Sequence, residues 1–431
     1  MSGGGAPRSA DGSGPERPAR PGPRDAVIVS AVRTPIAKGR PARTGKPGGA
    51  LHGWHPVDLA AVAMRAALHR AGVQPDRIAD LALDDVLVGC VGQAGEQSFN
   101  IGRNAALAAG LAEEVPAATI DRQCGSSQQA LSFAAQAIRA GDADAVLVAG
   151  VESMSRVPMG SAAGGADPYG PSLAARYPGG LVPQGISAEL IAARWSLDRA
   201  ELDAFAAASH RRAAEAAERG VVDDELATIE IDRGEGRAGE PFTRDEGVRP
   251  GTTVATLAGL EPVFRDPAWE ERFPELRWVV HAGNASQLSD GAAALLVLSR
   301  ERAEAEGHTP RARIRTAVAV GTDPILNLTG VIPATAKALA RAGLTIRDIG
   351  AFEVNEAFAP VVLAWLAETG ADPACVNVRG GAIANGHPLG ASGAKLTTTL
   401  LSVMEERDVA LGLQVMCEGG GMANATIFER S

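Results

Sequence analysis

Short apolar runs alternate with longer segments of helical periodicity through most of this chain. Residues 26–32 form an apolar run that predicts a first strand, and the apolar spacing of residues 57–71 predicts an amphipathic helix that Gly72 ends. The pattern also predicts strands at 85–89, 117–120 and 144–150, and helices at 100–109 and from just after Cys124 to about 139. Such alternation predicts an α/β fold, with a sheet covered by helices on both faces.

The last third of the chain repeats this scheme. Residues 342–350 (AGLTIRDIG) echo residues 71–79 (AGVQPDRIA), because each is a helix stop followed by a short link into a strand. Small residues open a helix at 390–394 as they do at 125–127, and valine-rich strands follow at 409–416 and 145–149. An internal duplication with two similar halves meeting face to face explains this pattern. Chance resemblance between two α/β segments is the alternative.

A different region separates the halves. Residues 160–185 are rich in Gly, Pro and Ala and predict a loop, whereas residues 187–219 predict two helices, the second starting near Asp198 and Glu201. We expect this insertion to act as a lid or a substrate-binding arm. The predicted organisation is a disordered tail (1–24), a first half (25–159 with about 284–305), an inserted loop domain (160–283) and a second half (306–431).

Composition and charge narrow the classes of function. The formal net charge of −10 and a pI near 5.3 argue against nucleic acid as a partner. No apolar run reaches the ~18 residues that a membrane span needs. The four cysteines form no CxxC pair, which suits a reducing compartment. The N-terminal segment lacks an apolar signal region and contains Asp11 and Glu16, so we expect a cytoplasmic protein.

Cys124 carries the clearest chemical signal. It stands in the string Arg-Gln-Cys-Gly-Ser-Ser, where small residues follow the thiol at a predicted strand-to-helix turn. The positive end of a helix lowers a thiol pKa, so we expect an exposed, reactive cysteine. A buried inert cysteine is the alternative. Cys90 and Cys375 are interpreted in that second way, as core residues at strand ends.

His387 is the candidate base for this thiol. Pro388 follows it and pushes its backbone into an extended conformation, so we expect the histidine in a loop that faces a cleft. If His387 takes the thiol proton, activity falls in acid as the pair becomes protonated.

Cys417 and Asn355 complete the candidate set. Cys417 ends an apolar strand and precedes Gly419, Gly420 and Gly421, which suit a backbone that a ligand approaches. Asn355 follows a predicted buried strand, so its amide is a candidate to hold a water or a carbonyl oxygen. A helix N-cap at Asn355 is the alternative.

Two patterns carry no function in this interpretation. Residues 234–239 (GEGRAG) fit a dinucleotide-binding motif by letters, but no apolar helix opens after them. The seven histidines and four cysteines show no metal-ligand spacing, so we predict no metal.

Taken together, these residues resemble those of the thiolase family of acyl-CoA acyltransferases. The resemblance runs from about residue 26 to the end of the chain. Its matching strings, in the family's order, are Arg122-Gln-Cys-Gly-Ser-Ser, Gly150-Val-Glu-Ser-Met-Ser, Asn284-Ala-Ser-Gln-Leu-Ser-Asp-Gly-Ala-Ala, Asn355-Glu-Ala-Phe-Ala, Gly380-Gly-Ala-Ile-Ala-Asn-Gly-His-Pro-Leu-Gly-Ala-Ser-Gly and Cys417-Glu-Gly-Gly-Gly. The resemblance implies two βαβαβαββ halves packed in layers, an inserted loop domain, and a homodimer or homotetramer.

The resemblance also implies residue roles. Cys124 would be the nucleophile that carries the acyl group, His387 its base, and Cys417 the acid or base at the α-carbon of the second substrate. One oxyanion hole would use His387 and a water held by Asn355, and the other would use backbone N–H groups of Cys124 and Gly419. No resident cofactor is implied, since coenzyme A and acyl-CoA are the substrates.

For coenzyme A, the resemblance implies one set of residues along the pantetheine and a second set of candidate phosphate or adenine contacts. The first set is Phe264, Ala282, Ser286, Ala357 and Phe358, and the second is Arg237, Arg244 and Arg249. The chain departs from the family pattern at Gln128, Pro183, Gln184 and Ala423-Asn424. Gln184 and the segment 160–185 should therefore shape the acyl pocket, whose preferred chain length stays open.

Two other functions were weighed against a thiolase. A β-ketoacyl synthase-like enzyme would use one cysteine with two histidines, whereas Cys417 and Asn355 stand in the thiolase positions here. A non-catalytic CoA-binding paralogue would lack a catalytic residue, and all four are present.

Overall fold

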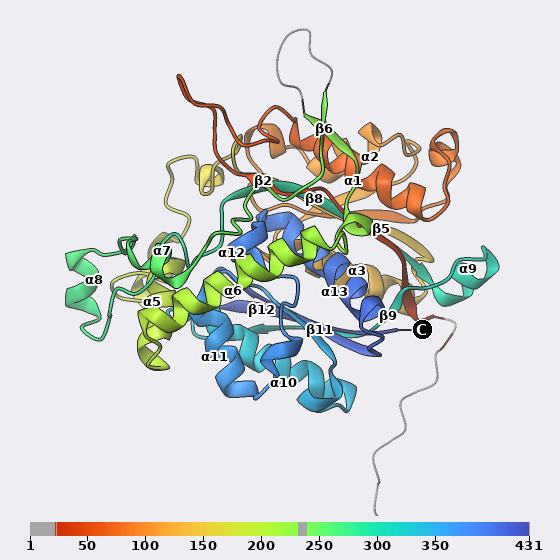
Figure 1. The fold of residues 1–431 in the computed structure, drawn as a ribbon. Helices are drawn as coiled ribbons and strands as arrows, with labels where there is room; N and C mark the ends of the chain where they lie inside the picture. The colour runs from red at the N-terminus through yellow and green to blue at the C-terminus, as the bar shows by residue number, and fades with distance from the viewer. Residues whose placement is uncertain (1–21, 23, 232–238, 431) are drawn as a thin grey trace, which may run out of the picture.

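The computed structural model describes residues 22, 24–231 and 239–430 (Figure 1). In that part of the chain, one large mixed sheet has the strand order β10-β11-β12-β9-β1-β8-β5-β3-β4, with the short β2 (Ala37–Lys38) beside β8. Its first half contains β1 (Ala26–Arg33), β3 (Asp85–Gly89), β4 (Ala117–Ile120), β5 (Ala145–Ser153) and β8 (Ser289–Ser299). Its second half contains β9 (Ala312–Gly321), β10 (Ala351–Val354), β11 (Leu411–Glu418) and β12 (Met422–Glu429).

The two halves repeat one strand order, which confirms the predicted duplication. In the first half β1, β8 and β5 are antiparallel neighbours, and β5, β3 and β4 then run parallel. In the second half β9, β12 and β11 are antiparallel, β11 and β10 run parallel, and a parallel bridge joins Phe352 to Val376 where β4 has its counterpart. Chance resemblance does not produce the same order and the same directions twice.

Helices form layers on and between the two halves (Figure 1). Helices α1 (Pro56–Arg70) and α2 (Ile101–Ala108) lie on the outer side of the first half, and α10 (Val331–Ala342) and α11 (Ala359–Thr369) on that of the second. Between them, α3 (Ser126–Ala140) and α13 (Ser392–Glu406) pack on each other and contact strands of both halves. The halves therefore meet face to face, as predicted, and the contact is made through α3 and α13. They are also joined edge to edge where Val27 of β1 pairs with Arg313 of β9.

A buried amide network fixes the junction between the halves. Gln128 of α3 donates from Nε2 to Thr426 Oγ1 at 2.9 Å and accepts from Gln414 Nε2 at 3.0 Å. All three side chains are buried. A polar residue is stable at position 128 because its amide oxygen and nitrogen both find partners on β11 and β12.

Helices outnumber strands in the described part of the segment between β5 and β8, although loops make up more than half of it. It contains α4 (Gly170–Arg176), α5 (Gln184–Arg194), α6 (Arg199–Glu218), β6 (Ile229–Ile231), β7 (Glu240–Phe242), α7 (Val254–Ala258) and α8 (Pro267–Arg272). Asp198 and Glu201 form a capping box at the start of α6, as their spacing predicts. The loop predicted for residues 160–185 is wrong in part, because α4 and a short turn at Ser161–Ala163 interrupt it.

Local patterns predicted most element bounds. The strands at 85–89 and 117–120 are confirmed, and β5 runs three residues beyond its predicted end. The predicted disordered tail falls almost wholly outside the described residues. Arg24, its last residue, is instead anchored, since its Nε donates to the Ile138 carbonyl at 2.9 Å.

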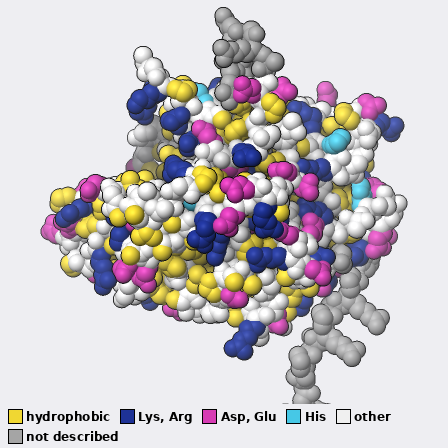
Figure 2. Space-filling model, viewed as in Figure 1, with side chains coloured by type: hydrophobic (Ala, Val, Ile, Leu, Met, Phe, Trp, Pro, Cys, Tyr) yellow, Lys and Arg dark blue, Asp and Glu magenta, His cyan; other side chains and the backbone are white. Residues whose placement is uncertain are grey.

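The described helices include none long and apolar enough to cross a membrane. On the face shown in Figure 2, basic and acidic side chains are interspersed rather than gathered into a single basic surface.

Candidate active site

The turn between β4 and α3 presents Cys124. The strand ends at Ile120 and the helix begins at Ser126, so Cys124 lies just before the first helical turn, as predicted. Gln123 adopts a left-handed backbone (φ 49°), and the Ser126 hydroxyl accepts from the Arg122 N–H at 2.9 Å. These contacts lock the turn and point the thiol inward.

The state of the Cys124 thiol differs from the sequence prediction. Its side chain is only 4% exposed. Burial raises the pKa of Cys124 above its ordinary range, and negative charge at Cys417 or Glu418 raises it further, whereas its own N–H and the Gln184 amide oppose the shift. The expectation of an exposed thiol with a lowered pKa is therefore wrong. Burial therefore favours a neutral thiol at Cys124, and a nucleophilic role for it would require a base.

Cys417 lies at the end of β11, buried and next to Cys124. Burial raises the pKa of Cys417 to about 12, and the Asn355 amide is the largest opposing influence. Charge on Cys417 is the second-largest cause of the raised pKa of Cys124, so the two thiols lie within the range of electrostatic interaction. Two adjacent neutral thiols can take and return protons in separate steps.

Asn355 lies directly after β10 and is tied to β11, because its N–H donates to the Val415 carbonyl at 3.0 Å. The alternative of a helix N-cap is wrong, since α11 begins at Ala359 with Phe358 as its cap. Among the described residues, neither polar atom of the buried Asn355 amide completes a hydrogen bond, although the amide lies close enough to Cys417 to influence its pKa. Buried amides require partners, so this one suits a water or a substrate oxygen.

His387 is held so that one ring nitrogen is free. Its Nδ1 lies 2.7 Å from Ser392 Oγ, and that hydroxyl donates its single proton to the Pro388 carbonyl at 2.9 Å. Ser392 can therefore only accept from His387, which assigns the proton to Nδ1. Nε2 is buried and has no hydrogen-bond partner in the described part of the chain. Burial, and then the charge of Lys395, lower the pKa of His387 to about 3, so the ring is neutral at physiological pH.

One segment holds the two loops of the second half in place. Residues 284–289 lie between them, where Ser286 N–H donates to the Ala357 carbonyl at 2.9 Å. On the other side, His387 N–H reaches Ser289 Oγ at 2.9 Å. This segment is one of the strings that carries the resemblance, and it links the loop that follows Asn355 to the His387 loop through these two hydrogen bonds.

Two buried carboxyl groups that sequence reasoning did not single out also fix the site. Glu152 accepts from the N–H groups of Val91 at 3.0 Å and Gly390 at 2.8 Å, which ties β5 to the His387 loop. Glu356 accepts from the Ser209 hydroxyl at 2.7 Å and from an Asn377 amide at 3.0 Å. Both lie inside strings noted in the sequence, but their partners come from distant segments, so no local signal identified them.

The predicted pantetheine residues cluster in part. The rings of Phe264 and Phe358 meet edge to face, with their centroids 6.0 Å apart. Ala357 precedes Phe358, and its carbonyl accepts from the Ser286 N–H, which brings Ser286 to the same cluster. Phe264 also covers the start of α5, where a Cβ on Gly185 would lie 2.4 Å from its ring. Ala282 is exposed and lies two residues before Asn284.

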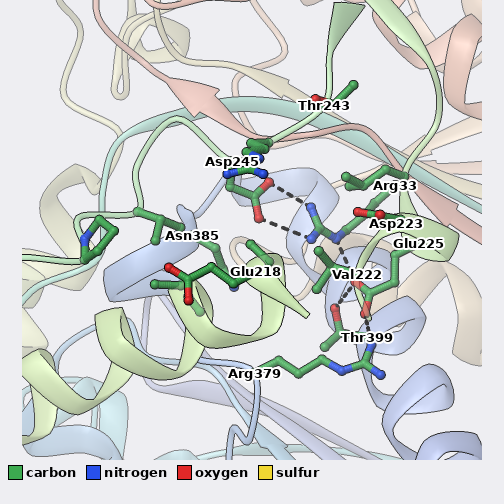
Figure 3. Close-up of a pocket in the computed structure, with 17 residues that line it drawn as sticks. Arg33, Glu218, Val222, Asp223, Glu225, Thr243, Asp245, Arg379, Asn385 and Thr399 are labelled. Atoms are coloured by element: carbon green, nitrogen blue, oxygen red, sulfur yellow. Dashed lines mark hydrogen bonds and ion pairs between the residues drawn. The ribbon is translucent and has the colours of Figure 1, made fainter. Parts of the chain in front are cut away.

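The predicted arginine contacts are dispersed. Arg237 lies outside the described residues. Arg249 is exposed, and its backbone N–H donates to His210 Nδ1 at 3.2 Å. Arg244 lines a cavity of about 160 Å³, shown in Figure 3, whose lining residues include none of the predicted pantetheine set.

That cavity is built around buried ion pairs. Arg33 binds Glu225 at 2.9 Å and Asp245 at 2.8 Å, and Arg379 binds the other oxygen of Glu225 (Figure 3). Asn385, two residues before His387, also lines it. The cavity therefore lies behind the His387 loop rather than at the thiols.

The other two cysteines differ from each other. Cys90 is buried at the end of β3, as predicted, with its thiol 3.9 Å from a Glu152 oxygen. Cys375 is half-buried and ends a short turn at Pro373–Cys375, so its assignment as a strand-end core residue is wrong.

Comparisons with known proteins agree with this geometry. The family model described as "Thiolase, N-terminal domain" matches residues 26–301, and that described as "Thiolase, C-terminal domain" matches residues 308–430. A steroid 3-ketoacyl-CoA thiolase from Mycobacterium tuberculosis is 46% identical over 414 residues, covering 94% of each chain. A 3-ketoacyl-CoA thiolase from Escherichia coli K12 is 44% identical over 407 residues, covering 94% of this chain and 99% of the relative.

A solved structure is similar over the same length. The crystal structure of human mitochondrial 3-ketoacyl-CoA thiolase has a TM-score of 0.81 and 33% identity, with 95% of this chain and 99% of that one covered. These matches favour a thiolase over a β-ketoacyl synthase-like enzyme or a non-catalytic paralogue. The chain belongs to the thiolase family and is an acyltransferase of that family.

Proposed function

We propose that this thiolase cleaves 3-ketoacyl-CoA thioesters with free coenzyme A, through an acyl group carried on Cys124. The reverse condensation uses the same residues. The observation that carries the proposal is a pair of buried neutral thiols with the His387 loop beside them, since Leu389 packs against the cluster that contains Cys124. Within the described residues, His387 Nε2 and the Asn355 amide are also buried without a hydrogen-bond partner.

In the first half-reaction, Cys124 Sγ attacks the 3-keto carbon while its proton passes to His387 Nε2. The bond between the α-carbon and the 3-keto carbon then breaks, and its electron pair forms the enolate of acetyl-CoA. Cys417 gives its proton to that α-carbon, which releases acetyl-CoA and leaves an acyl group on Cys124. The raised pKa of Cys124 favours loss of the thiol proton to a base during the attack, and we assign that base to His387.

In the second half-reaction, the thiol of free coenzyme A attacks the acyl group on Cys124. Its proton passes to the Cys417 thiolate, and His387 returns its proton to Cys124 Sγ as the shortened acyl-CoA leaves, so both thiols and the imidazole are neutral again. We propose that a water on Asn355 together with His387 stabilises the thioester enolate oxygen, and that the N–H groups of Cys124 and Gly419 stabilise the tetrahedral oxyanion. Such donors are typically worth about 3–4 kcal/mol each.

We assign the pantetheine contacts to the cluster of Phe264, Ser286, Ala357 and Phe358, with Ala282 at its exposed end. Apolar rings beside free backbone groups suit a pantetheine arm. Arg249, and Arg237 outside the described residues, remain proposed phosphate contacts. Arg244 is the weaker member of that set, because it lines the separate cavity.

Gln184 supports a proposal on the acyl group. It is the first residue of α5, its amide opposes the raised pKa of Cys124, and a Cβ on Gly419 would lie 3.4 Å from its Nε2. We propose that Gln184 and the segment 160–185 line the acyl pocket. Relatives named for 3-ketoacyl-CoA and steroid 3-ketoacyl-CoA support a degradative role with chains longer than acetoacetyl.

The experiment is thiolysis of a 3-ketoacyl-CoA series from acetoacetyl-CoA to long and steroid-like chains. Preference for long or bulky chains supports the degradative proposal. A sharp preference for acetoacetyl-CoA would make the chain an acetyl-CoA acetyltransferase. No turnover of any substrate contradicts the proposed reaction altogether.

We also propose a homo-oligomer, built on the open edge of the first half at β4. Phe99, just before α2, is 93% exposed, and Leu107 and Phe133 are 42% and 40% exposed on the helices that flank this edge. An open strand edge beside exposed apolar side chains suits a second copy of the chain. A monomer by analytical ultracentrifugation would contradict this assignment.

We keep two further proposals from the sequence. Four free cysteines among the described residues suit a reducing compartment such as the cytoplasm. The division into two halves (25–159 with 284–305, and 306–431) and an insertion (160–283) suits the repeated strand order.

A further inference from the structure

Glu418 is a buried carboxyl that the proposed reaction does not use. It follows Cys417 as the last residue of β11, and its side chain is fully buried. Because side chains alternate along a strand, Glu418 points away from the Cys417 side, toward the start of α3. It therefore lies behind the other thiol of the site.

The contact with the Cys124 turn is close. A Cβ placed on Gly125 would lie 1.9 Å from Glu418 Oε1, so only glycine fits after Cys124 while the carboxyl occupies this position. Asn424 of β12 lies beside both, donating from Nδ2 to the Gly125 carbonyl at 3.2 Å. The Cys124–Gly125 backbone thus rests directly on Glu418.

The carboxyl has no complete hydrogen bond in the described part of the chain. Both its oxygens, Asn424 Oδ1 and Arg122 Nε are buried and unpartnered there. The charged and titratable groups that face it are Arg122 and Asp121 on the turn and the two catalytic thiols. An unpartnered buried carboxyl favours its neutral form.

Burial has the largest influence on the pKa of Glu418, because the nearby charges of Arg122 and Asp121 act in opposite directions. Burial raises the pKa of Glu418 to about 8, Arg122 lowers it, and Asp121 raises it. At neutral pH the group is therefore an uncharged acid. Ionised Glu418 raises the pKa of both Cys124 and Cys417, so its charge opposes the formation of either thiolate.

We propose that Glu418 is a positioning residue that must be protonated for the catalytic thiols to react. In its neutral form it supports the Cys124–Gly125 backbone without placing negative charge beside the thiol. When it loses its proton to solvent in alkali, the buried carboxylate suppresses thiolate and oxyanion at Cys124. The inference rests on the proposed role of Cys124 as nucleophile.

The test follows alkylation of Cys124 by iodoacetamide from pH 6 to 10, with mass spectrometry to identify the modified residue. Wild-type protein and Glu418→Gln should react alike at pH 6.5. At pH 9 Glu418→Gln should react about threefold faster or more, since half a pKa unit at Cys124 changes the thiolate fraction about threefold. Equal rates at pH 9, or one constant ratio at every pH, would overturn the proposal.

Lys395 provides the matched control. It is buried behind His387, its Nζ donates to Asn385 Oδ1 at 2.6 Å, and burial lowers its pKa to about 8, in the same range. Arginine stays charged from pH 6 to 10. The change of slope that ionisation of Glu418 causes in the plot of alkylation rate against pH (the alkaline bend) should therefore persist in Lys395→Arg. If the bend disappears in Lys395→Arg, the titrating group is the lysine and the proposal fails.

A measurement on wild-type protein covers the case in which Glu418→Gln does not fold. Infrared difference spectra should show a protonated carboxyl band disappearing at the pH of the alkylation bend. A bend with no loss of that band overturns the proposal. If alkylation of Cys124 leaves thiolysis intact, Cys124 is not the nucleophile and the proposed function fails. If alkylation blocks thiolysis but the ratio of alkylation rates between Glu418→Gln and wild type does not change with pH, only the role proposed for Glu418 fails.

Discussion

His387 Nδ1 and Ser392 Oγ lie 2.7 Å apart, and this contact decides which ring nitrogen acts as the base. The Ser392 hydroxyl donates its proton to the Pro388 carbonyl, so it can only accept a hydrogen bond from the imidazole. Nε2 has no hydrogen-bond partner among the described residues, so it is the nitrogen that we propose accepts a proton from Cys124. Both residues lie in one loop-and-helix unit, whereas the thiol comes from the other half of the chain.

Ser392→Ala should lower kcat about ten- to a hundredfold with little change in KM. The variant removes the acceptor that fixes the tautomer and ring orientation of His387, and a positioned base is worth about two to four orders of magnitude. Steady-state thiolysis measures both constants. Ser402→Ala, on the same helix α13 and half-buried, is the control and should stay near wild type. An unchanged kcat in Ser392→Ala would remove Ser392 from the site.

Cys124→Ala should abolish thiolysis while the protein stays folded, because the variant lacks the thiol to which we assign the acyl group. Cys417→Ala should also lose overall turnover but still form an acyl group on Cys124 from acetyl-CoA, since that step needs only Cys124 and His387. Intact-protein mass spectrometry detects the acyl adduct. Full activity in either variant, with unfolding curves like those of wild type, contradicts the separate roles proposed for Cys124 and Cys417.

Protonation of His387 should not reduce activity between pH 7 and pH 5. The pKa of His387 is lowered to about 3, so the ring stays neutral throughout this range and remains able to accept a proton. This differs from the sequence-based expectation of a fall in acid. Initial rates after brief pH jumps, with circular dichroism to confirm folding, measure it. A loss of kcat/KM with a midpoint near 6.5 would show a histidine in its ordinary state.

The same lowered pKa makes His387 an acid-sensitive element of stability. Between about pH 6.5 and 3, His387 is protonated in the unfolded chain but stays neutral in the folded chain. Because the unfolded state binds more protons, the free energy of unfolding falls as the pH falls through this range. One such group costs up to about 1.4 kcal/mol per pH unit. Urea unfolding of wild type and His387→Gln at pH 7 and 5 should show a smaller decrease in the variant. Equal decreases would contradict this linkage.

Glu225→Gln should destabilise the fold by about 3–5 kcal/mol, because it leaves part of the Arg33 and Arg379 charge unpaired in the interior. Glu225 is fully buried between these arginines. Denaturant unfolding measures the change. Glu215→Gln is the matched control, since its pair with Arg211 is about 60% exposed on both sides and should contribute almost nothing. A loss below 1 kcal/mol at Glu225 would show that the cavity in Figure 3 is solvated.

Most of the strands, the duplication and the position of each candidate catalytic residue along the elements could be predicted from local sequence patterns. Strands 85–89 and 117–120 follow from apolar runs bounded by turns, and Cys124 at a strand-to-helix turn follows from its small neighbours. Cys417 at a strand end is confirmed in the same way. These features are local, so periodicity and turn chemistry suffice to predict them.

The protonation states and hydrogen-bond partners of those residues depend on tertiary packing and could not be predicted in this way. Burial favours the neutral thiol at Cys124 over the thiolate. Asn355 follows β10 without acting as a helix N-cap, and its amide lies close enough to Cys417 to influence the pKa of that thiol. Ser392 selects the His387 tautomer, and Glu418 meets Gly125 from nearly three hundred residues away in the chain. Desolvation and hydrogen bonding depend on which distant segments close around a group, and no local pattern of residues records that closure.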